Sequence, residues 1–381
     1  MAKFFNPVKM FFGVGELKKL SEIIESSGGK KDKKLLLLTG AYSLKKSGRL
    51  AEITSQLKEY DWSLFDQIPS NPDVEDLFRL KEKTDACEYN FIIAVGGGSV
   101  IDAGKSLAAF NGLKIHSPQD IRKTINENDY RDKNYINCPI LAVPTTAGTG
   151  SEVTSWATVW DKQENLKYSI EHSTLYPEIA IVDPELTLNL TAEMTAASAL
   201  DAISHAMEAY WSKNTNEIVR MYALKAIENI AKNLEALLNN PEDLELRSKI
   251  AYGSLFAGLA FSNTKTTACH SISYPLTLMF GINHGVAVSL TLGKMLLKNE
   301  KSLIKKDDLL GAYGVSHVEE VEEFIQKILD KAGLGSRLRD YGVSDSDLSE
   351  IADKSFTPGR MDNNPVDIDR QFLFELLETI Y

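Results

Sequence analysis

The chain has 381 residues, of which 43% are hydrophobic and 25% are charged. This composition is ordinary for a folded globular protein, and the length favours two domains because single cores stop growing at about 250–300 residues. The formal net charge of -11 argues against a nucleic-acid partner and against a basic membrane-binding surface.

The chain shows no pattern for export or for a membrane span. Its first residues lack a signal-peptide pattern, and no apolar run reaches the ~18 residues of a spanning helix. The three cysteines form no C-x-x-C pair, as expected in a reducing compartment. We therefore expect a cytoplasmic protein without a membrane partner.

Three apolar runs in the first half predict buried parallel strands. They lie within residues 34–43, 91–99 and 139–152, are rich in Leu, Ile and Val without alternation, and end in glycine or threonine loops. A helical pattern at 48–60 lies between the first two. Alternating strands and helices predict an α/β domain with a largely parallel sheet, which binds ligands at the carboxyl ends of its strands.

The loop after the second run is a candidate for phosphate binding. Glycines 96–98 would let the backbone approach a pyrophosphate, and Ser99 with Asp102 forms an S-x-x-D capping pattern at a helix start. The P-loop pattern fails because Ser99 stands where it needs glycine, and the Rossmann fingerprint fails at Ile101. An ordinary glycine turn is the competing interpretation.

The loop at residues 145–154, TTAGTGSEVT, is a second candidate. Its hydroxyls could bind phosphate or amide groups. They belong to Thr145, Thr146, Thr149, Ser151 and Thr154. A strand-to-helix connection rich in local hydrogen bonds explains the same residues equally well.

From residue 186 onward the patterns are those of amphipathic or buried helices. We therefore expect two domains, an α/β dinucleotide-binding domain at 1–185 and an all-helical metal-binding and substrate domain at 186–381.

Four residues of the second half have the types and spacing of a metal site. Asp201 and His205 are four apart in an apolar helix and therefore share one face, while Pro275 and Gly281 should interrupt the helix between His270 and His284. One carboxylate and three imidazoles suit Fe²⁺ or Zn²⁺. The alternative is that these histidines are buried and bond only to their neighbours.

Taken together, these motifs resemble the iron-containing alcohol dehydrogenase family, in which GGGSxxD, TTxGTGSE, D-A-x-x-H-A-x-E and H-x-x-x-x-P...HG occur in this order. The resemblance runs from about residue 5 to the NNP segment near the C-terminus. It implies the two-domain architecture that this family shares with dehydroquinate synthase, usually in a homodimer or larger homo-oligomer. It also implies a divalent metal, Fe²⁺ with Zn²⁺ as the alternative, and NAD or NADP.

The resemblance assigns roles residue by residue. It makes Asp201, His205, His270 and His284 the metal ligands. The expected coenzyme-binding residues are Gly97, Gly98, Ser99, Asp102, Asn71, Thr145, Thr146, Thr149, Thr154 and Lys167.

The chain departs from the family pattern at two places. Thr39-Gly40 replaces the aspartate that NAD-preferring relatives carry after the first strand, so NADPH is allowed, and Ser43, Lys45 and Lys46 could bind its 2′-phosphate. Tyr274 stands where many relatives have a second histidine. A tyrosine suits protonation of an alkoxide, so we predict Tyr274, together with His270, as catalytic in carbonyl reduction. Transfer of the proton by water is the alternative.

The string at residues 258–285 is similar to that of the phosphonoacetaldehyde reductase branch, with Lys265 and Arg360 as candidates for the anionic head group. The predicted function is hydride transfer from NAD(P)H to a small aldehyde, and the resemblance to this branch implies phosphonoacetaldehyde as the candidate. The alternatives are a general short-chain aliphatic alcohol dehydrogenase, a metal- and NAD-dependent lyase of the dehydroquinate synthase type, and a non-catalytic nucleotide-binding protein.

Overall fold

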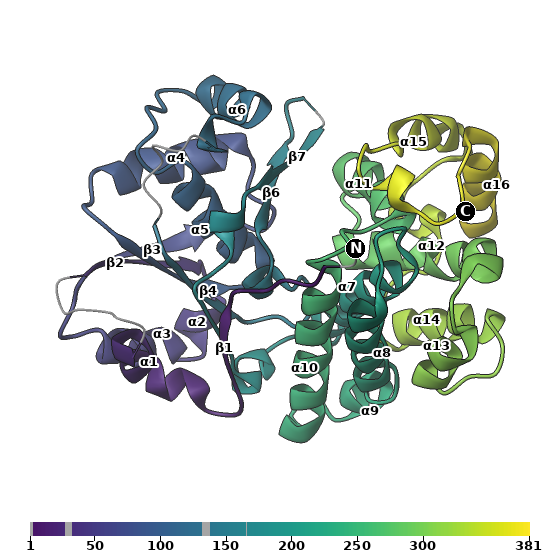
Figure 1. Ribbon diagram of the computed structural model, residues 1–381, viewed down its shortest axis with the longest axis horizontal. Helices are drawn as coiled ribbons and strands as arrows, with labels where there is room; N and C mark the ends of the chain where they lie inside the picture. Colours follow the sequence, from purple (N-terminus) through teal and green to yellow (C-terminus); the bar gives the residue numbers. More distant parts are fainter. Residues whose placement is uncertain (1–2, 27–32, 132–137, 165) are drawn as a thin grey trace. The chain divides into compact units, whose positions relative to one another are not determined.

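The computed structural model describes residues 3–26, 33–131, 138–164 and 166–381. They form two compact units (Figure 1). The α/β unit comprises Pro7–Thr146 and Ser151–Asn189, and the helical unit comprises Leu190–Tyr381 with Ala147–Gly150 and the N-terminal residues up to Asn6. An N-terminal α/β part with a parallel sheet and a helical C-terminal part are thus confirmed. The units differ in detail from the expected ranges, because two short segments of the first half belong to the helical unit.

The α/β unit is built on a six-stranded sheet in the order β1-β8-β5-β4-β2-β3, in which every neighbouring pair is parallel. The three apolar runs are its central strands β2, β4 and β5, as predicted. Its strands are β1 (Lys9–Phe12), β2 (Lys34–Gly40), β3 (Asp61–Ile68), β4 (Phe91–Gly96), β5 (Ile140–Pro144) and β8 (Ile179–Val182). Strands β6 (Trp156–Asp161) and β7 (Leu166–Glu171) form a separate antiparallel pair.

Both faces of the sheet are buried, which explains the unbroken apolar runs. Leu36 and Leu38 pack into one cluster with residues of α4, α5 and α6, whereas Leu35 and Leu37 pack into another with residues of α1 and α3. A strand covered on both sides needs apolar residues at every position. The helices of this unit are α1 (Leu20–Ser26), α2 (Ser43–Lys46), α3 (Arg49–Gln56), α4 (Val74–Asp85), α5 (Gly98–Ala109) and α6 (Pro118–Glu127).

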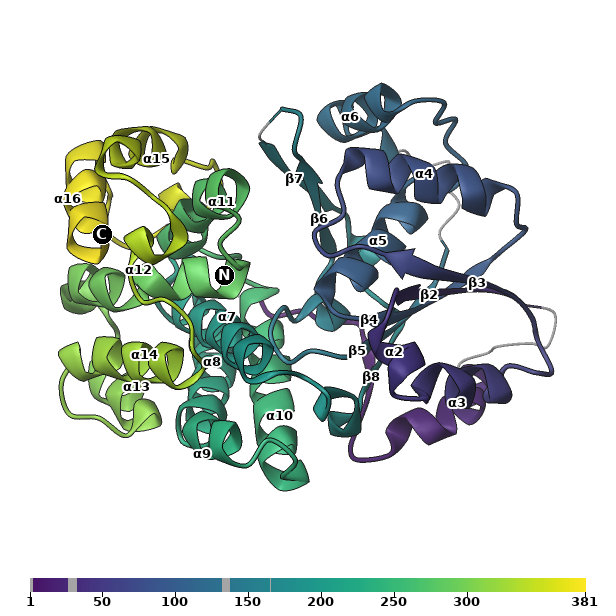
Figure 2. The same cartoon turned by 180° about the vertical axis from the view of Figure 1, so that it is seen from behind.

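The helical unit is organised around α7 (Ala192–Trp211), which contacts α8, α10 and α12 (Figure 2). Its other helices are α8 (Glu217–Ala231), α9 (Leu234–Asn239), α10 (Leu244–Phe261), α11 (Ala268–Phe280), α12 (His284–Asn299), α13 (Lys306–Tyr313), α14 (Glu319–Lys331), α15 (Leu348–Lys354) and α16 (Arg370–Ile380). Over the described residues, none of the helices combines the length and the apolarity needed to cross a membrane.

The segment Ala147–Gly150 joins the helical unit through two close approaches of its backbone. A Cβ on Gly148 would lie 2.7 Å from the carbonyl oxygen of Ser198 in α7, and one on Gly150 would lie 2.6 Å from the Cα of Gly258 in α10. Gly150 also has a φ of 58°, which favours glycine. The glycines of the TTAGTGSE loop therefore serve packing as well as turning.

Candidate metal centre and coenzyme loops

Helix α7 carries the first two predicted metal ligands. Thr191 caps its N-terminus by accepting a hydrogen bond from the amide of Met194, and the helix continues through the alanine-rich segment for 20 residues. Asp201 and His205 lie one turn apart and are both buried. The ring of His205 stacks on Phe261, with 4.0 Å between ring centroids, so its orientation is fixed by packing.

Helices α11 and α12 carry the other two predicted metal ligands. His270 lies in the first turn of α11, and His284 is the first residue of α12. The expectation that Pro275 would break the helix is wrong, because α11 runs through Pro275 to Phe280. Gly281, with a φ of 67°, ends the helix as predicted. The turn back toward α7 is therefore made at Gly281.

The side chains of His205, His270 and His284 all approach Oδ1 of Asp201. The ligand atoms of Asp201, His270 and His284 lie within 4.8 Å of one another. Oδ1 of Asp201 is 3.7 Å from Nε2 of His270, 3.9 Å from Nε2 of His284 and 3.8 Å from Nδ1 of His205. These distances are too long for hydrogen bonds, yet they fit ligands that share an ion at about 2.0–2.2 Å from each.

Three of the converging atoms are buried without a hydrogen-bond partner in the described part of the chain: Asp201 Oδ1, His205 Nδ1 and His270 Nε2. Buried polar atoms are normally satisfied, and each orphan costs about 1–3 kcal/mol. A divalent cation would satisfy all three at once. The residues present therefore fit a metal ion.

The charges of the cluster influence one another strongly. Burial alone would raise the pKa of Asp201, but the nearby imidazoles of His205, His270 and His284 outweigh it and hold that pKa below its ordinary range. Burial lowers the pKa of His205 to about 4. The carboxylate and this imidazole are therefore deprotonated at neutral pH, as metal ligands must be. For His270, burial lowers the pKa but Glu208 and Asp201 outweigh it and raise the pKa to about 9, so a metal ion would displace a proton from this ring.

Tyr274 lies beside this cluster. It is one turn after His270 on α11, is 6% exposed, and stacks on His284 with 6.1 Å between ring centroids. The structure thus places the predicted proton donor next to a predicted ligand. Its part in catalysis remains a prediction.

Most of the predicted coenzyme residues lie in the α/β unit at the carboxyl ends of β4 and β5. Gly97 is the N-cap of α5, and no side chain caps that helix. The amide of Asn71, which has a φ of 51°, donates to the hydroxyl oxygen of Ser99 at 2.9 Å. Thr146 is the nearest neighbour of Gly97, 3.4 Å from a Cβ built there. The amide of Thr145 donates to the carbonyl of Gly96, so these two loops are tied together.

The capping pattern predicted for Ser99 and Asp102 is wrong. Oδ1 of Asp102 instead accepts from the hydroxyl of Ser151 at 2.5 Å, and Oδ2 accepts from the amide of Thr158 at 3.0 Å. Lys167, on β7, is close enough to lower the pKa of Asp102, although burial dominates and raises it. Thr149 lies in the other unit, within Ala147–Gly150.

Sequence reasoning did not anticipate the role of Lys105. Lys105 lies inside α5 between Gly104 and Ser106, and its ammonium is buried there. It donates to four oxygens: the carbonyl and hydroxyl of Ser151, the hydroxyl of Thr154 and the carbonyl of Trp156, at 2.6–3.1 Å. Lys105 thereby ties α5 to the end of the threonine loop. Its sequence signal was a lysine in a helix whose other charged residue is Asp102.

Replacing the neighbouring Glu152 with glutamine should change how stability depends on pH. Burial raises the pKa of Glu152 from an ordinary 4.5 to about 7. The folded state therefore favours the protonated acid. The contribution of Glu152 to the free energy of unfolding is fully present below pH 4.5 and is lost as the pH rises through 7. At about 1.4 kcal/mol for each pH unit, the loss reaches about 3 kcal/mol. We expect the free energy of unfolding of E152Q to show no such loss, because glutamine cannot ionise.

The measurement is the midpoint of thermal unfolding of both proteins between pH 5 and 7. In this window Lys105, whose pKa burial lowers to about 8, remains largely protonated. The midpoint of the wild-type protein should fall relative to that of E152Q. Parallel curves across the window would contradict the prediction.

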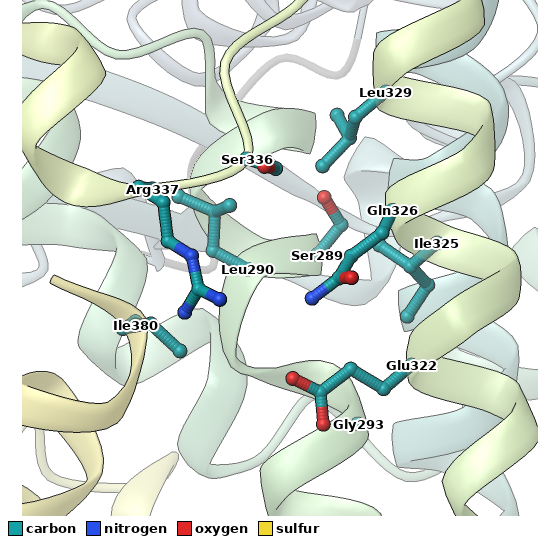
Figure 3. Close-up of a pocket in the computed structure, with 10 residues that line it drawn as sticks. All are labelled: Ser289, Leu290, Gly293, Glu322, Ile325, Gln326, Leu329, Ser336, Arg337 and Ile380. Carbon is teal, nitrogen blue, oxygen red and sulfur yellow. The ribbon is translucent and has the colours of Figure 1, made fainter.

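The pocket drawn in Figure 3 is elsewhere in the helical unit. Side chains of α12 and α14, with Arg337 and Ile380, line it, and none of the predicted metal, coenzyme or catalytic residues does. Its charged groups already have partners: Glu322 pairs with Lys294 at 2.8 Å, and Arg337 donates to the carbonyl of Thr379. It therefore offers no competing candidate site.

A parallel sheet with glycine and threonine loops, joined to helices that hold a carboxylate–imidazole cluster, defines a class of metal- and dinucleotide-dependent proteins. Two family models match the chain. The model for iron-containing alcohol dehydrogenase matches residues 7–184, and the model for the C-terminal part of the Fe-containing alcohol dehydrogenase family matches residues 195–381. The chain therefore belongs to the iron-containing alcohol dehydrogenase family. It is an NAD(P)-dependent oxidoreductase, as predicted.

Relatives cover essentially the whole chain. The NAD-dependent methanol dehydrogenase of Bacillus methanolicus is 30% identical over 387 residues, covering 96% of each chain. The NADPH-dependent butanol dehydrogenase of Clostridium saccharobutylicum is 27% identical and covers 100% of this chain and 98% of its own. The solved sulfoacetaldehyde reductase from Bifidobacterium kashiwanohense in complex with NAD⁺ is 29% identical, with a TM-score of 0.87 over 100% of this chain and 98% of that one.

Proposed function

We propose that Asp201, His205, His270 and His284 of the helical domain, residues 186–381, would hold a divalent cation, Fe²⁺ or Zn²⁺, and that this domain binds a small aldehyde beside them. The observation that carries the proposal is the set of three unpartnered buried atoms, in which His205 Nδ1 and His270 Nε2 lie 3.8 and 3.7 Å from Asp201 Oδ1. One oxygen and three nitrogen donors suit either metal. When bound, the ion supplies Lewis-acid stabilisation of the negative charge that develops on the aldehyde oxygen.

The residues of the chain have three tasks in this proposal. The α/β domain, residues 1–185, would hold and orient the nicotinamide coenzyme, which supplies the hydride. The buried walls around His205 and His270 exclude water, which strengthens every charge interaction made there. Tyr274 donates the proton that turns the alkoxide into the alcohol, or positions a water molecule that does so.

We propose that the coenzyme pyrophosphate binds at the N-terminus of α5, where Gly97, Gly98 and Ser99 present backbone amides. The other coenzyme contacts are assigned to the remaining predicted residues. They are Asn71, Asp102, Thr145, Thr146, Thr149, Thr154 and Lys167. Asp102 acts through Ser151 and Thr158, to which its carboxylate is bonded. Lys45 pairs with Asp66 at 2.5 Å, so recognition of a 2′-phosphate of NADPH is left to Ser43 and Lys46.

For the substrate we propose a small aldehyde with an anionic head group, with phosphonoacetaldehyde as the candidate. Lys265 lies between Thr264 and Thr266, whose carbonyls both accept from the side-chain Nδ2 of Asn363 at 2.9 and 3.0 Å. Arg360 precedes Asn363 by three residues, so the two cations are on adjoining segments of the helical domain. The solved relative named for sulfoacetaldehyde, another anionic aldehyde, supports this class. A short-chain aliphatic aldehyde is the second candidate, favoured by the methanol and butanol dehydrogenases.

A panel of aldehydes tests the proposal. Phosphonoacetaldehyde, sulfoacetaldehyde and butanal are compared as substrates with NADH and with NADPH, by the loss of absorbance at about 340 nm that accompanies hydride transfer from the reduced coenzyme. We expect kcat/KM to be at least about tenfold higher for an anionic aldehyde, because a charged hydrogen bond contributes about 1.5–3 kcal/mol. Equal values for butanal would remove the anionic substrate and favour the aliphatic one.

Two variants assign the effect to the named cations. Lys265→Gln and Arg360→Gln should raise KM for phosphonoacetaldehyde and leave KM for butanal unchanged. Lys327→Gln, which removes an exposed cation of α14, is the matched control. Turnover of substrate without net oxidation of NAD(P)H would instead indicate the lyase chemistry of dehydroquinate synthase. A homodimer or larger homo-oligomer and a cytoplasmic location remain predictions.

A further inference from the structure

Glu208 is a buried carboxylate that the mechanism above does not use. It lies on α7, one turn after His205, and is 0% exposed. Its Oε2 accepts a hydrogen bond from Nδ1 of His270. Its Oε1 accepts from the hydroxyl of Thr267 at 2.8 Å, from the amide of Cys269 at 2.7 Å and from the amide of His270 at 3.3 Å. Both oxygens are therefore committed to the start of α11.

The bond to Nδ1 determines which nitrogen of His270 can bind a metal. A carboxylate only accepts hydrogen bonds, so Nδ1 must carry the proton. In the neutral ring, Nε2 then bears the lone pair, and Nε2 is the atom that faces Asp201 Oδ1 at 3.7 Å without a hydrogen-bond partner. The ring is thus oriented and given its tautomer by the same contact.

We propose that Glu208 is a positioning residue that holds His270 in the tautomer and ring orientation required for metal binding. This inference rests on the proposed metal site. The same carboxylate places the backbone of His270, because it binds two amides in the first turn of α11, where the N-cap residue Thr267 makes no side-chain cap of its own. Trp211 donates to the hydroxyl oxygen of Thr267 at 2.9 Å, which directs the Thr267 proton toward Glu208. Glu208 thereby holds both the backbone and the ring of His270.

Glutamine at this position cannot replace the carboxylate. If its amide nitrogen faces His270, Nδ1 must become the acceptor and the proton moves to Nε2, where it blocks metal binding. If its amide nitrogen faces the start of α11, that nitrogen, itself a donor, lies against three other donors: the hydroxyl of Thr267 and the backbone amides of Cys269 and His270. Either arrangement should weaken metal binding while the shape of the side chain is preserved.

The experiment titrates the metal-free full-length protein with Zn²⁺ in competition with a chromophoric chelator. We expect Glu208→Gln to bind Zn²⁺ about 10–100-fold more weakly than the wild-type protein, the loss typical when a partner of a metal-bound histidine is removed. The matched control is Tyr210→Phe on the same helix, which loses the bonds from its hydroxyl to the carbonyls of Ile304 and Lys305. It should lower the unfolding temperature and leave the affinity unchanged.

Three results would contradict the inference. Zn²⁺ affinity of E208Q equal to that of the wild-type protein would overturn it directly. An equally large loss in Thr267→Val, which removes one donor from Oε1 and leaves the bond to Nδ1, would assign the effect to capping of α11 instead. If the wild-type protein bound no Zn²⁺, the metal site itself would fail, which is a distinguishable outcome. Should E208Q not fold, Glu208→Asp, whose shorter side chain draws the carboxylate away from Nδ1, is expected to show the same loss.

Discussion

Replacement of His270 with alanine should remove the metal and the turnover together. His270 is 3% exposed and supplies one of the three unpartnered atoms of the cluster. Without it the remaining donors cannot enclose an ion, so metal affinity should fall by more than the roughly 10–100-fold expected when only a partner of a ligand is lost. Because Lewis-acid stabilisation is worth several kcal/mol, kcat/KM should fall at least about 100-fold.

Metal content after purification and aldehyde reduction are measured on the same preparation. Zn²⁺ added to the metal-free wild-type protein should raise its unfolding temperature, since a ligand that binds only the folded state stabilises it, whereas H270A should not respond. His317→Ala is the matched control, because that histidine is exposed in the same unit and lies outside the cluster. Full aldehyde reduction by metal-free H270A would refute the assignment.

The elements that could be predicted are those whose cause is local. Leu35–Leu38 predict a buried strand because every residue is apolar, and the spacing of Asp201 and His205 places both on one face of a helix. That His270 and His284 meet them depends on how α11 and α12 pack against α7, which no spacing within either segment specifies. The resemblance to a family supplied that step, and the geometry of the helical unit is consistent with it.

The errors arose where partners distant in the sequence displaced local patterns. Ser99 and Asp102 match a capping pattern, but Asn71 and Ser151 bind their side chains instead. Pro275 lacks an amide proton, yet α11 continues through it to Phe280, and the residues from Ala268 to Leu276 are all buried. The sequence showed Glu208 only as the last residue of the D-A-x-x-H-A-x-E motif. Its role could not be predicted because its hydrogen-bond partners lie at the start of α11, about 60 residues further along the chain.

The second prediction with a large expected effect concerns Gly285, the residue after His284. A Cβ on Gly285 would lie 2.0 Å from the carbonyl oxygen of Ala197 and 3.0 Å from Cβ of Asp201. Both belong to α7, so the first turn of α12 can approach α7 only because residue 285 has no side chain. This approach is what brings His284 toward Asp201.

We therefore expect Gly285→Ala to separate the two helices and to weaken metal binding as well as folding. Overpacking commonly costs about 1–3 kcal/mol, and a clash with backbone, which cannot rotate away, should place this variant at the upper end. The readouts are the unfolding temperature of the metal-free protein and its Zn²⁺ affinity by competition. Both should fall, because the displaced His284 can no longer complete the cluster.

Gly311→Ala provides the matched control. Gly311 lies within α13, and nothing is within 4 Å of a Cβ built on it. The same chemical change should there stabilise the protein by about 0.5–1 kcal/mol, through the higher helix propensity of alanine, and leave Zn²⁺ affinity unchanged. If G285A instead bound Zn²⁺ as tightly as the wild-type protein, the close approach of α12 to α7 would not be what positions His284, and the metal centre would have to be formed by the remaining ligands alone.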